Sequence, residues 1–421
     1  LGLMPVLGNG NPVETMIANL TLDFAGKYSG RPWHGLDRNN FAPSAGLAWD
    51  VFGNGRTALR AGYGISYVND QHVGALVSNV DINEGLIGIS ADYGLSATLS
   101  RPPSIPKPVF KVPRTFADNY DENPSTAFGL IDPRLRTPYV QQWNFAIEQE
   151  WRSTIFELRY AGNHQVKGFR DFDFNQVIIR ENGFLDDFRR AQANGFLARA
   201  RTGSFDPSYN PTIPGSQPLT VFPKLYQGGT LRNAAIRGLI EAGEAGQLAS
   251  QYQIDGLNGS VNFFRNPYGL GCDYLTNFSS ASYNALQFDV RRRMKQGLSV
   301  QANYAFAKVL SDTSGTSQSR LEHFLDLTNA AIERSRAPYD ITHVVNATAV
   351  WDLTVGDKPR LNWPRAGRLA TGWSVSGILN WQSGAPFSVL SSRGTLNRTG
   401  GGRSYENGAN TTLTKGQLDE L

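Results

Sequence analysis

The chain has 421 residues, a formal net charge of +4 and 40% hydrophobic residues, which suffices for one large domain or several smaller ones. Its mean hydropathy is -0.34, and no apolar run approaches the roughly 20 residues of a membrane-spanning helix, so a helical membrane protein is excluded. The 40 Lys and Arg are spread among 36 Asp and Glu without a concentrated basic face, so we expect no nucleic-acid partner.

Residues 1–38 show no regular pattern and are predicted to be an irregular segment or an extracellular loop. They begin without the charged and apolar regions of a signal peptide, so for an exported protein we expect a processed or truncated start. Residues 41–51 then alternate apolar with small or polar side chains, and residues 59–67 alternate again beyond a Gly53-Asn54-Gly55 turn. This combination predicts a β-hairpin.

Three further pairs of alternating segments follow the first hairpin. They are 139–151 with 156–160, 283–294 with 298–306, and 345–353 with 373–381. We therefore predict about eight strands in four hairpins. The segments are about 9–12 residues long, as needed for a tilted strand to cross a bilayer, whereas strands of soluble proteins usually have about 5–6 residues.

Aromatic side chains gather at both ends of these segments. Trp49, Trp151, Trp351 and Trp373 lie next to the short turns, and Tyr67, Tyr139, Tyr160, Tyr283 and Trp381 lie toward the opposite ends. Two rings of amphipathic aromatics, one at each membrane interface, are expected of an outer-membrane β-barrel. A soluble core would not sort Trp and Tyr by depth, so we predict that these side chains lie at the membrane interfaces.

The connections on the two sides of the predicted sheet differ in length. Three turns are short and a fourth, roughly 354–370, is longer, whereas the opposite connections are long, at 68–138, 162–282 and 311–342. Short turns on one side and long loops on the other are typical of periplasmic turns and extracellular loops.

These patterns predict an all-β fold class, an antiparallel transmembrane β-barrel whose strands and loops occupy residues 39–387. Helical spacing at 185–201 and 233–248 predicts short helices inside the second long loop. Residues 388–421 are predicted to be a loop that leads to strands not present in this chain, because eight strands cover only part of a large barrel.

Charged residues occupy the strand positions that alternate with the apolar ones. They are Arg60, Glu148, Glu157, Arg159, Asp289 and Arg291. A charge on the lipid side of a barrel costs roughly 2–4 kcal/mol at the bilayer midplane, so their one-sided placement identifies the wet, lumen-facing side. We expect these six side chains to contact a substrate or a plug domain.

No catalytic or metal-binding motif is convincing, and we expect no catalytic residue, no cofactor and no metal site. The five histidines are scattered without metal-ligand spacing, and the single Cys272 excludes an internal disulfide framework and a multi-cysteine site. Asp118, Asp121 and Glu122 form an acidic cluster of the kind that can bind calcium. They lack a Gly-centred ligand loop, so a solvated acidic loop is the favoured interpretation.

Several short stretches resemble the Oar-like branch of the TonB-dependent receptors, in the order found in that family. They are Asn39–Pro43, Gly46–Asp50, Gly62–Ile65, Thr137–Asn144, Tyr160–His164, Tyr283–Gln287, Ala302–Lys308, Gly377–Leu379 and Gln382–Phe387. Each stretch is weak by itself, and the ordered series is the more specific signal. The resemblance covers about residues 39–387.

The resemblance implies a bacterial outer-membrane location and uptake or exchange of a large substrate, driven from the inner membrane through TonB. Members of the family typically have a carboxypeptidase-regulatory-like domain, a TonB box, a plug and a barrel of about 22 strands. This chain lacks the first three, so we expect it to be part of a longer protein. The expected partners are outer-membrane lipid, TonB through regions absent from this chain, and other surface proteins.

Two other interpretations stay open at this point. The first is a non-transporting outer-membrane barrel that serves adhesion or surface assembly. The second is a soluble carbohydrate-binding β-protein or glycosidase. The soluble alternative predicts that the apolar side of the strands is buried against a second sheet.

Overall fold

The computed structural model of the chain describes most of its residues. The described residues are 2–7, 16–67, 72–83, 85–87, 100, 109–124, 126–295, 297–313, 324, 327, 329–355, 358–359, 373–387, 390–391, 393–394 and 407–408. In this part of the chain, no helix is long and apolar enough to cross a membrane. The predicted turn at 354–370 and the predicted loop at 388–421 fall mostly outside the described residues.

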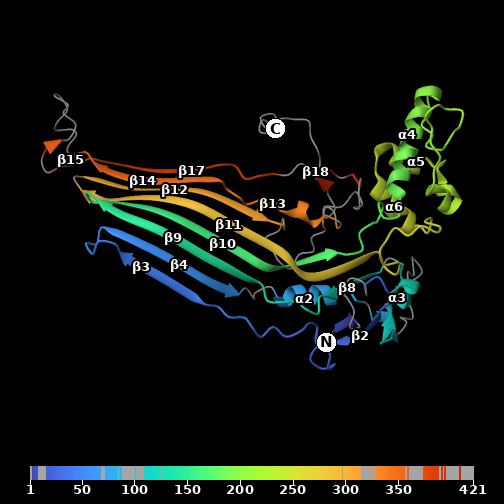
Figure 1. The fold of residues 1–421 in the computed structure, drawn as a ribbon, viewed down its shortest axis with the longest axis horizontal. Coiled ribbons are helices and arrows are strands. Elements are labelled where there is room, and N and C mark those ends of the chain that lie inside the picture. Colours follow the sequence, from blue (N-terminus) through green and yellow to red (C-terminus); the bar gives the residue numbers. More distant parts are fainter. Residues whose placement is uncertain are drawn as a thin grey trace.

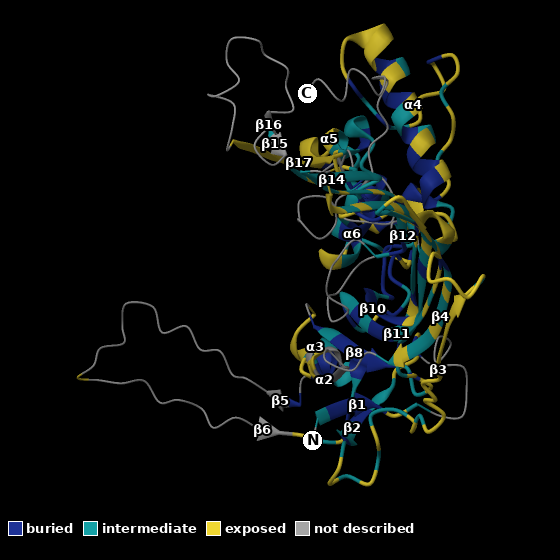
Figure 2. Ribbon diagram, turned by 90° about the vertical axis from the view of Figure 1, so that its left-hand side faces the viewer, coloured by how far each residue is buried: buried dark blue, intermediate teal, exposed yellow. Residues whose placement is uncertain are grey.

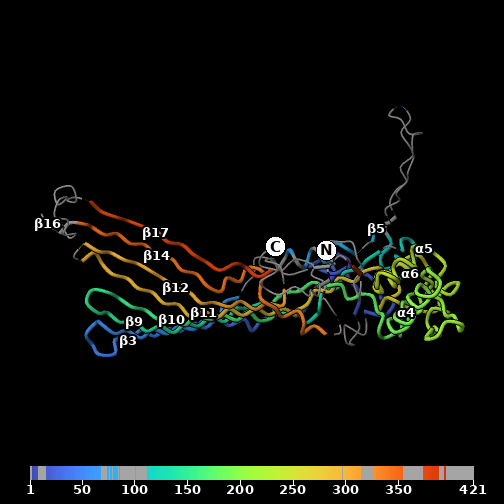
Figure 3. The backbone as a smooth tube through the Cα atoms, turned by 90° about the horizontal axis from the view of Figure 1, so that it is seen from above, coloured from blue at the N-terminus to red at the C-terminus, as the bar shows by residue number. Residues whose placement is uncertain are grey.

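Eight long strands form one curved antiparallel sheet (Figure 1, Figure 3). They are β3 (Ser44–Asp50), β4 (Thr57–Tyr67), β9 (Tyr139–Trp151), β10 (Thr154–Asp173), β11 (Gly271–Lys295), β12 (Leu298–Ser311), β14 (His343–Asp352) and β17 (Ser374–Gln382). Strands that follow one another in this series are also neighbours in the sheet. The predicted strands and their hairpin pairing are therefore confirmed, and the described sheet is open between β3 and β17.

The turns at one end of the sheet explain why these hairpins form. Gly53 and Gly55 have φ angles of +65° and +70°, a conformation that side chains disfavour, and the Asp50 carboxylate accepts the Gly55 N–H at 2.7 Å. Arg152 and Ser153 join β9 to β10 with φ angles of +48° and +70°. Positive φ at both central residues matches the twist of two-residue hairpins.

Strands β10 and β11 run well beyond membrane-spanning length, so the loop predicted at 162–282 starts too early and ends too late. The two strands pair from Thr154 opposite Arg292 to Asp173 opposite Asp273, with a bulge around Gly168. Residues 168–172 are all buried, on both faces of β10. Because both faces are covered, this extension has no apolar–polar alternation, and the sequence pattern does not reveal it as a strand.

A small layered unit, here called the cap, packs at the outer ends of β10 and β11. It contains β1 (Gly2–Pro5), β2 (Thr21–Ala25), α2 (His72–Val80), β7 (Arg114–Thr115), α3 (Phe116–Glu122) and β8 (Ala127–Ile131). Strands β1, β2 and β7 form a three-stranded sheet, and β8 adds to β11 in parallel. The described part of residues 1–38 therefore contains two strands and is not irregular, while the alternative that this segment is an extracellular loop stays a prediction. The two N-terminal strands are short, and their partners are each other and a segment about ninety residues away.

Residues 174–270 form a helical insert between β10 and β11, at the same end of the molecule as the cap (Figure 1). Its elements are α4 (Phe184–Thr202), η2 (Phe222–Lys224), η3 (Tyr226–Thr230), α5 (Ala234–Ala242) and α6 (Ala245–Ile254). The helix predicted at 185–201 is confirmed as α4. The single helix predicted at 233–248 is wrong, because Gly243 at φ +79° ends α5 and a second helix follows.

Short elements complete the described chain. They are β5 (Leu86–Ile87), β6 (Val109–Phe110), η4 (Ala330–Glu333), β13 (Ser335–Arg336), β15 (Thr354–Val355), β16 (Lys358–Pro359), β18 (Leu390–Ser391) and β19 (Asn407–Gly408). The buried apolar side chains gather in the insert and in the cap with the adjoining ends of β10 and β11 (Figure 2). The rest of the sheet lies outside these cores, so packing against protein does not explain its apolar side chains.

Candidate functional site

One side of the sheet, here called the apolar face, exposes a broad field of large hydrophobic side chains. They include Leu47, Tyr63, Phe145, Ile147, Leu158, Leu286, Phe288, Tyr304, Phe306, Val375 and Leu379, each between 38% and 60% exposed. The strand register places them side by side, with Leu158 opposite both Ile147 and Phe288. A soluble protein rarely exposes such a patch. The expectation of the soluble alternative, burial against a second sheet, is therefore contradicted in the described structure.

All but one of the predicted interface aromatics follow the alternation of the apolar face. Trp49, Tyr67, Tyr139, Trp151, Tyr160, Trp351 and Trp381 share its register, and Trp373 directly precedes β17 and is 64% exposed. The exception is Tyr283, which lies opposite Asn163 on the other side of the sheet. Its placement is corrected because the apolar positions of β11 are the even ones, such as Leu286 and Phe288. Interface depth stays a prediction for the others.

The predicted lumen-facing charges share the opposite side of the sheet, here called the polar face. Glu148, Glu157 and Asp289 stand directly opposite one another on β9, β10 and β11. The same transverse row continues into Asn303 and Asn346, whose amides form a hydrogen bond of 3.0 Å. Arg60, Arg159 and Arg291 occupy the neighbouring rows. The structure thus brings together six charges that come from four strands.

Glu157 is the centre of this charge network. Its side chain is 3% exposed, one carboxylate oxygen accepts a hydrogen bond from Arg291 at 2.7 Å, and the other accepts one from Arg159. The Arg60 guanidinium lies 3.9 Å from the carboxylate of Glu148. Two charge-assisted hydrogen bonds hold the Glu157 side chain in place between two other carboxylates. Both of its oxygens are therefore occupied by protein donors.

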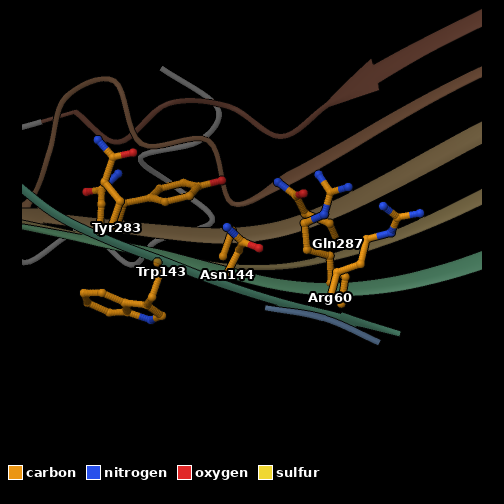
Figure 4. A pocket seen from close by; sticks show the side chains of 11 residues that line it. Arg60, Trp143, Asn144, Tyr283 and Gln287 are labelled. Carbon is orange, nitrogen blue, oxygen red and sulfur yellow. The ribbon is translucent and has the colours of Figure 1, made fainter. Parts of the chain in front are cut away.

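A hollow of about 380 Å³ opens on the polar face beside this network (Figure 4). Its lining comes from β4, β9, β10 and β11, and in Figure 4 the side chains of Arg60, Asn144, Tyr283 and Gln287 project to one side of the sheet. Trp143 projects to the other side, where its indole occupies the space above its cross-strand partner Gly162. Apart from Trp143 and Gly162, the residues that line the hollow all belong to the polar face.

The hollow exists because one transverse row of the polar face carries, apart from Asn144, only glycine and alanine at these positions. The row runs through Gly62, Asn144, Ala161, Ala285 and Ala307. A Cβ on Gly62 would lie 2.8 Å from the Asn144 amide nitrogen, so this glycine makes room for the asparagine. Larger polar side chains rise from the rows on both sides of the small one.

A family model of the outer membrane beta barrel domain matches residues 7–420, nearly the whole chain. The chain belongs to this outer-membrane β-barrel family. The protein is accordingly a bacterial outer-membrane protein, and lipid is the solvent that covers its apolar face. The polar face is the side that a barrel turns toward its interior.

Several solved structures are similar to this barrel domain. They include the FpvAI–pyocin S2 complex (9% identity, TM-score 0.32, covering 83% of this chain and 24% of that one), the alcaligin receptor FauA from Bordetella pertussis (9%, 0.29, 87% and 32%) and the siderophore receptor PirA from Acinetobacter baumannii (9%, 0.30, 81% and 33%). The chain spans about a quarter to a third of their length. Comparison with curated proteins finds no match. The family assignment rests on the family model.

Several polar residues of the barrel wall were not singled out from the sequence. Asn163 and Gln287 line the hollow together with Gln142 and with Tyr283, which was predicted as an interface aromatic, although β10 and β11 are separated by the helical insert. Their alternation within each strand was a usable signal for the face on which they lie. The pairing of β10 with β11 decides that they meet, and this register has no local signature.

The acidic residues at 118–122 of this barrel domain form a helix rather than a solvated loop. Asp118 is the third residue of α3, and its carboxylate accepts the backbone N–H of Thr115 at 2.7 Å in a capping box. This hydrogen bond and those from Lys111 and the Thr115 hydroxyl lower the pKa of Asp118 to about 2. Glu122 pairs with the buried Arg114 at 2.6 Å. Among the described residues, no cluster of His, Cys, Asp and Glu is arranged to hold a metal.

Three aspartates meet where the extended strands enter the cap, outside the roughly 11 residues of a strand that cross the bilayer. Asp173 stands opposite Asp273, and Asp171 accepts a hydrogen bond from the buried Asn79 of α2 at 3.1 Å. Burial, reinforced by the neighbouring carboxylates, raises the pKa of Asp171 and of Asp173 to about 7. Burial alone raises that of Asp273 to about 6.

We expect the cap of this barrel to loosen as the pH rises. A carboxyl whose pKa is raised in the folded state stabilises that state when protonated, and the contribution is lost as the pH rises through about 6–7. A single carboxyl titrating near 7 changes stability by roughly 2 kcal/mol between about pH 5 and about pH 8. Hydrogen exchange of the α2 and β8 amides, corrected for intrinsic rates, measures this. An Asp171→Asn, Asp173→Asn variant should flatten the dependence, and an unchanged slope would contradict the assignment.

Proposed function

We propose that this outer-membrane barrel is the wall of a TonB-dependent receptor of the Oar-like branch, which takes up or exchanges a substrate across the outer membrane. The observation that carries the proposal is the two-sided sheet, with lipid-compatible side chains on one face and a hydrated charge network on the other. A non-transporting barrel needs no such set of partly exposed guanidinium and amide groups on its inner wall.

In this proposal, substrate meets the protein first at its outer surface. The chain would then consist of an N-terminal segment (1–38), barrel strands with their loops (39–387) and a following loop (388–421). The cap and the helical insert would be its substrate-binding surface structures. The lumen-facing charges, among them Arg60, Glu148 and Asp289, then contact substrate or a plug domain. TonB would engage parts of the full-length protein other than this chain, and the outer surface offers contacts to other surface proteins.

We expect no catalytic role for this barrel. Receptors of this kind move or bind ligands without changing them, and the ion pairs of the polar face are not arranged as a nucleophile with a base. The Glu157 carboxylate, for example, has both oxygens occupied by Arg159 and Arg291. A general base needs a free lone pair within reach of a substrate proton.

Comparison of solute uptake in three strains tests the transport proposal. A deletion strain, a strain complemented with the full-length gene, and the complemented strain treated with a proton-motive-force uncoupler are grown in one medium, and solute depletion is followed by mass spectrometry. We expect at least one solute to be depleted faster by the complemented strain, with the difference abolished by the uncoupler. Changed gel mobility on boiling verifies the folded barrel. Equal depletion, with complementation restoring only attachment to cells or surfaces, would favour the adhesion alternative.

A further inference from the structure

The hollow on the polar face presents polar side chains that have few partners in the protein. Among the described residues, no hydrogen bond satisfies the guanidinium of Arg60, the amides of Asn144, Asn163 and Gln287, or the hydroxyl of Tyr283. Arg60 makes only its 3.9 Å ion pair with Glu148. Hydrogen-bonding groups that converge without satisfying one another are characteristic of a ligand site, where a few placed polar groups determine orientation.

The groups around the hollow are predominantly donors. Two guanidiniums, from Arg60 and Arg159, stand in one row with the Gln287 amide, and the amides of Gln142 and Asn163 and the Tyr283 phenol stand in the row on the other side of Asn144. No carboxylate lines the hollow, and the nearby Glu157 has both oxygens occupied by Arg159 and Arg291. Arginine has no acceptor and offers five N–H groups in a fixed fork that matches the oxygens of a carboxylate or phosphate. A ligand that pairs with the N–H groups of these guanidiniums must therefore supply hydrogen-bond acceptors.

Shape and position favour a small solute. The hollow has a volume of about 380 Å³ and a floor that includes Ala146 and Ala161. Its amide-lined side, at Gln142, lies three residues from the start of β9, nearer to the end of the sheet that carries the cap and the insert than to the Arg152-Ser153 turn. A solute that passes the surface structures reaches this side first.

We propose that the hollow binds the carboxylate or phosphate group of a small acidic solute, with Arg60 and Arg159 as the anion-binding residues and the amides completing the oxygen contacts. The inference rests on the proposed role in uptake, since it names the chemical class of solute that the inner wall recognises. Arg159 would bridge the solute and Glu157, which holds the guanidinium in place.

The chain offers a closely matched control for this site. Arg159 and Arg291 both donate to Glu157, are similarly exposed at 42% and 47%, and lie in adjacent strands, but only Arg159 lines the hollow. Replacing either arginine by glutamine removes one partner of the same buried carboxylate, so both variants carry a similar structural cost. A difference between them in ligand binding therefore reports on the hollow.

Calorimetric titration of the full-length protein, folded in detergent at low ionic strength, tests the proposal. The probes are succinate, inorganic phosphate, the uncharged succinamide and glucose. We expect succinate or phosphate to bind with a Kd of about 1 mM or tighter, and succinamide and glucose to bind at least about ten-fold more weakly. We expect Arg60→Gln and Arg159→Gln to weaken anion binding about ten-fold or more, and Arg291→Gln to change it less than about three-fold.

Three results would overturn the inference. They are equal binding of succinate and succinamide, equal losses in the Arg159→Gln and Arg291→Gln variants, and absence of binding by all probes, as expected if another segment of the full-length protein fills the hollow. The titration needs neither TonB nor an energised membrane. Absence of energised uptake in cells would therefore refute the transport proposal without affecting the anion-binding proposal. Absence of binding in the titration would refute only the anion site in the hollow.

Discussion

Ala347→Arg should destabilise the folded barrel by roughly 2–4 kcal/mol, the cost of a basic side chain on the lipid side near the bilayer midplane. Ala347 lies in the middle of β14 on the apolar face, opposite Ala302 and the exposed Leu379. Lipid covers this face, so the guanidinium must either lose its hydration or draw water into the bilayer. Denaturant titration of the protein folded into lipid vesicles, followed by tryptophan fluorescence, measures the loss.

Thr348→Arg is the matched control for this substitution. Thr348 is the next residue of the same strand at nearly the same depth, but it lies on the polar face opposite Gln301. The new arginine there stays hydrated, and we expect the free energy of unfolding to change by less than about 0.5 kcal/mol, as for an ordinary surface substitution. If the two variants lose similar stability, or if Thr348→Arg loses more, the assignment of lipid and lumen faces is incorrect.

Gly129→Ala should detach the cap from the extended sheet. Gly129 is in the middle of β8, and an added Cβ would lie 1.8 Å from the backbone oxygen of Asn79 in α2. The strand cannot move aside, because Asn83 holds the backbone of Gly129 with two hydrogen bonds of 2.9 Å, one in each direction. A clash between two backbones has no rotamer that relieves it. We expect the cap to lose about 3 kcal/mol, at the upper end of the range for overpacked cores.

Hydrogen exchange of the α2 and β8 amides reports this loss, and Gly74→Ala provides the control. Gly74 lies in the same helix, is exposed and has no atom within 4 Å of an added Cβ. Alanine there should stabilise the helix by about 0.5–1 kcal/mol, because glycine loses more backbone entropy on folding. Protection of α2 that stays unchanged in Gly129→Ala would show that α2 and β8 do not pack as described.

Much of the barrel was accessible from the sequence alone. Lipid on one side and water on the other make apolar and polar side chains alternate with a period of two along each strand. About ten consecutive residues are enough to show this pattern. The neighbours Ala347 and Thr348 illustrate it, since each side chain indicates its own face. The turn Gly53-Asn54-Gly55 is equally local, because its positive φ angles are intrinsic to the residues that form it.

Only part of the candidate site could be predicted from the sequence. Alternation placed Glu157 and Arg291 on one face, but not in contact, because their hydrogen bond joins residues separated by 134 positions. Tyr283 was assigned to the interface aromatics because it begins an alternating segment, although its odd position already groups it with Gln287 and Asp289, and its pairing with Asn163 places it on the polar face. The hollow requires four strands in register, so no single segment contains its signature.

The sequence by itself determined the strands, their hairpins, the two faces and the outer-membrane class of this protein, since each depends on the solvent that a local stretch of chain meets. Tertiary structure alone decided the cap, the long extension of β10 and β11, the meeting of Asp171, Asp173 and Asp273, and the anion-binding hollow. These features arise where protein covers both faces of a strand, or where strands distant in the chain pair. In the first case alternation disappears, and in the second the register depends on contacts between segments that share no local pattern.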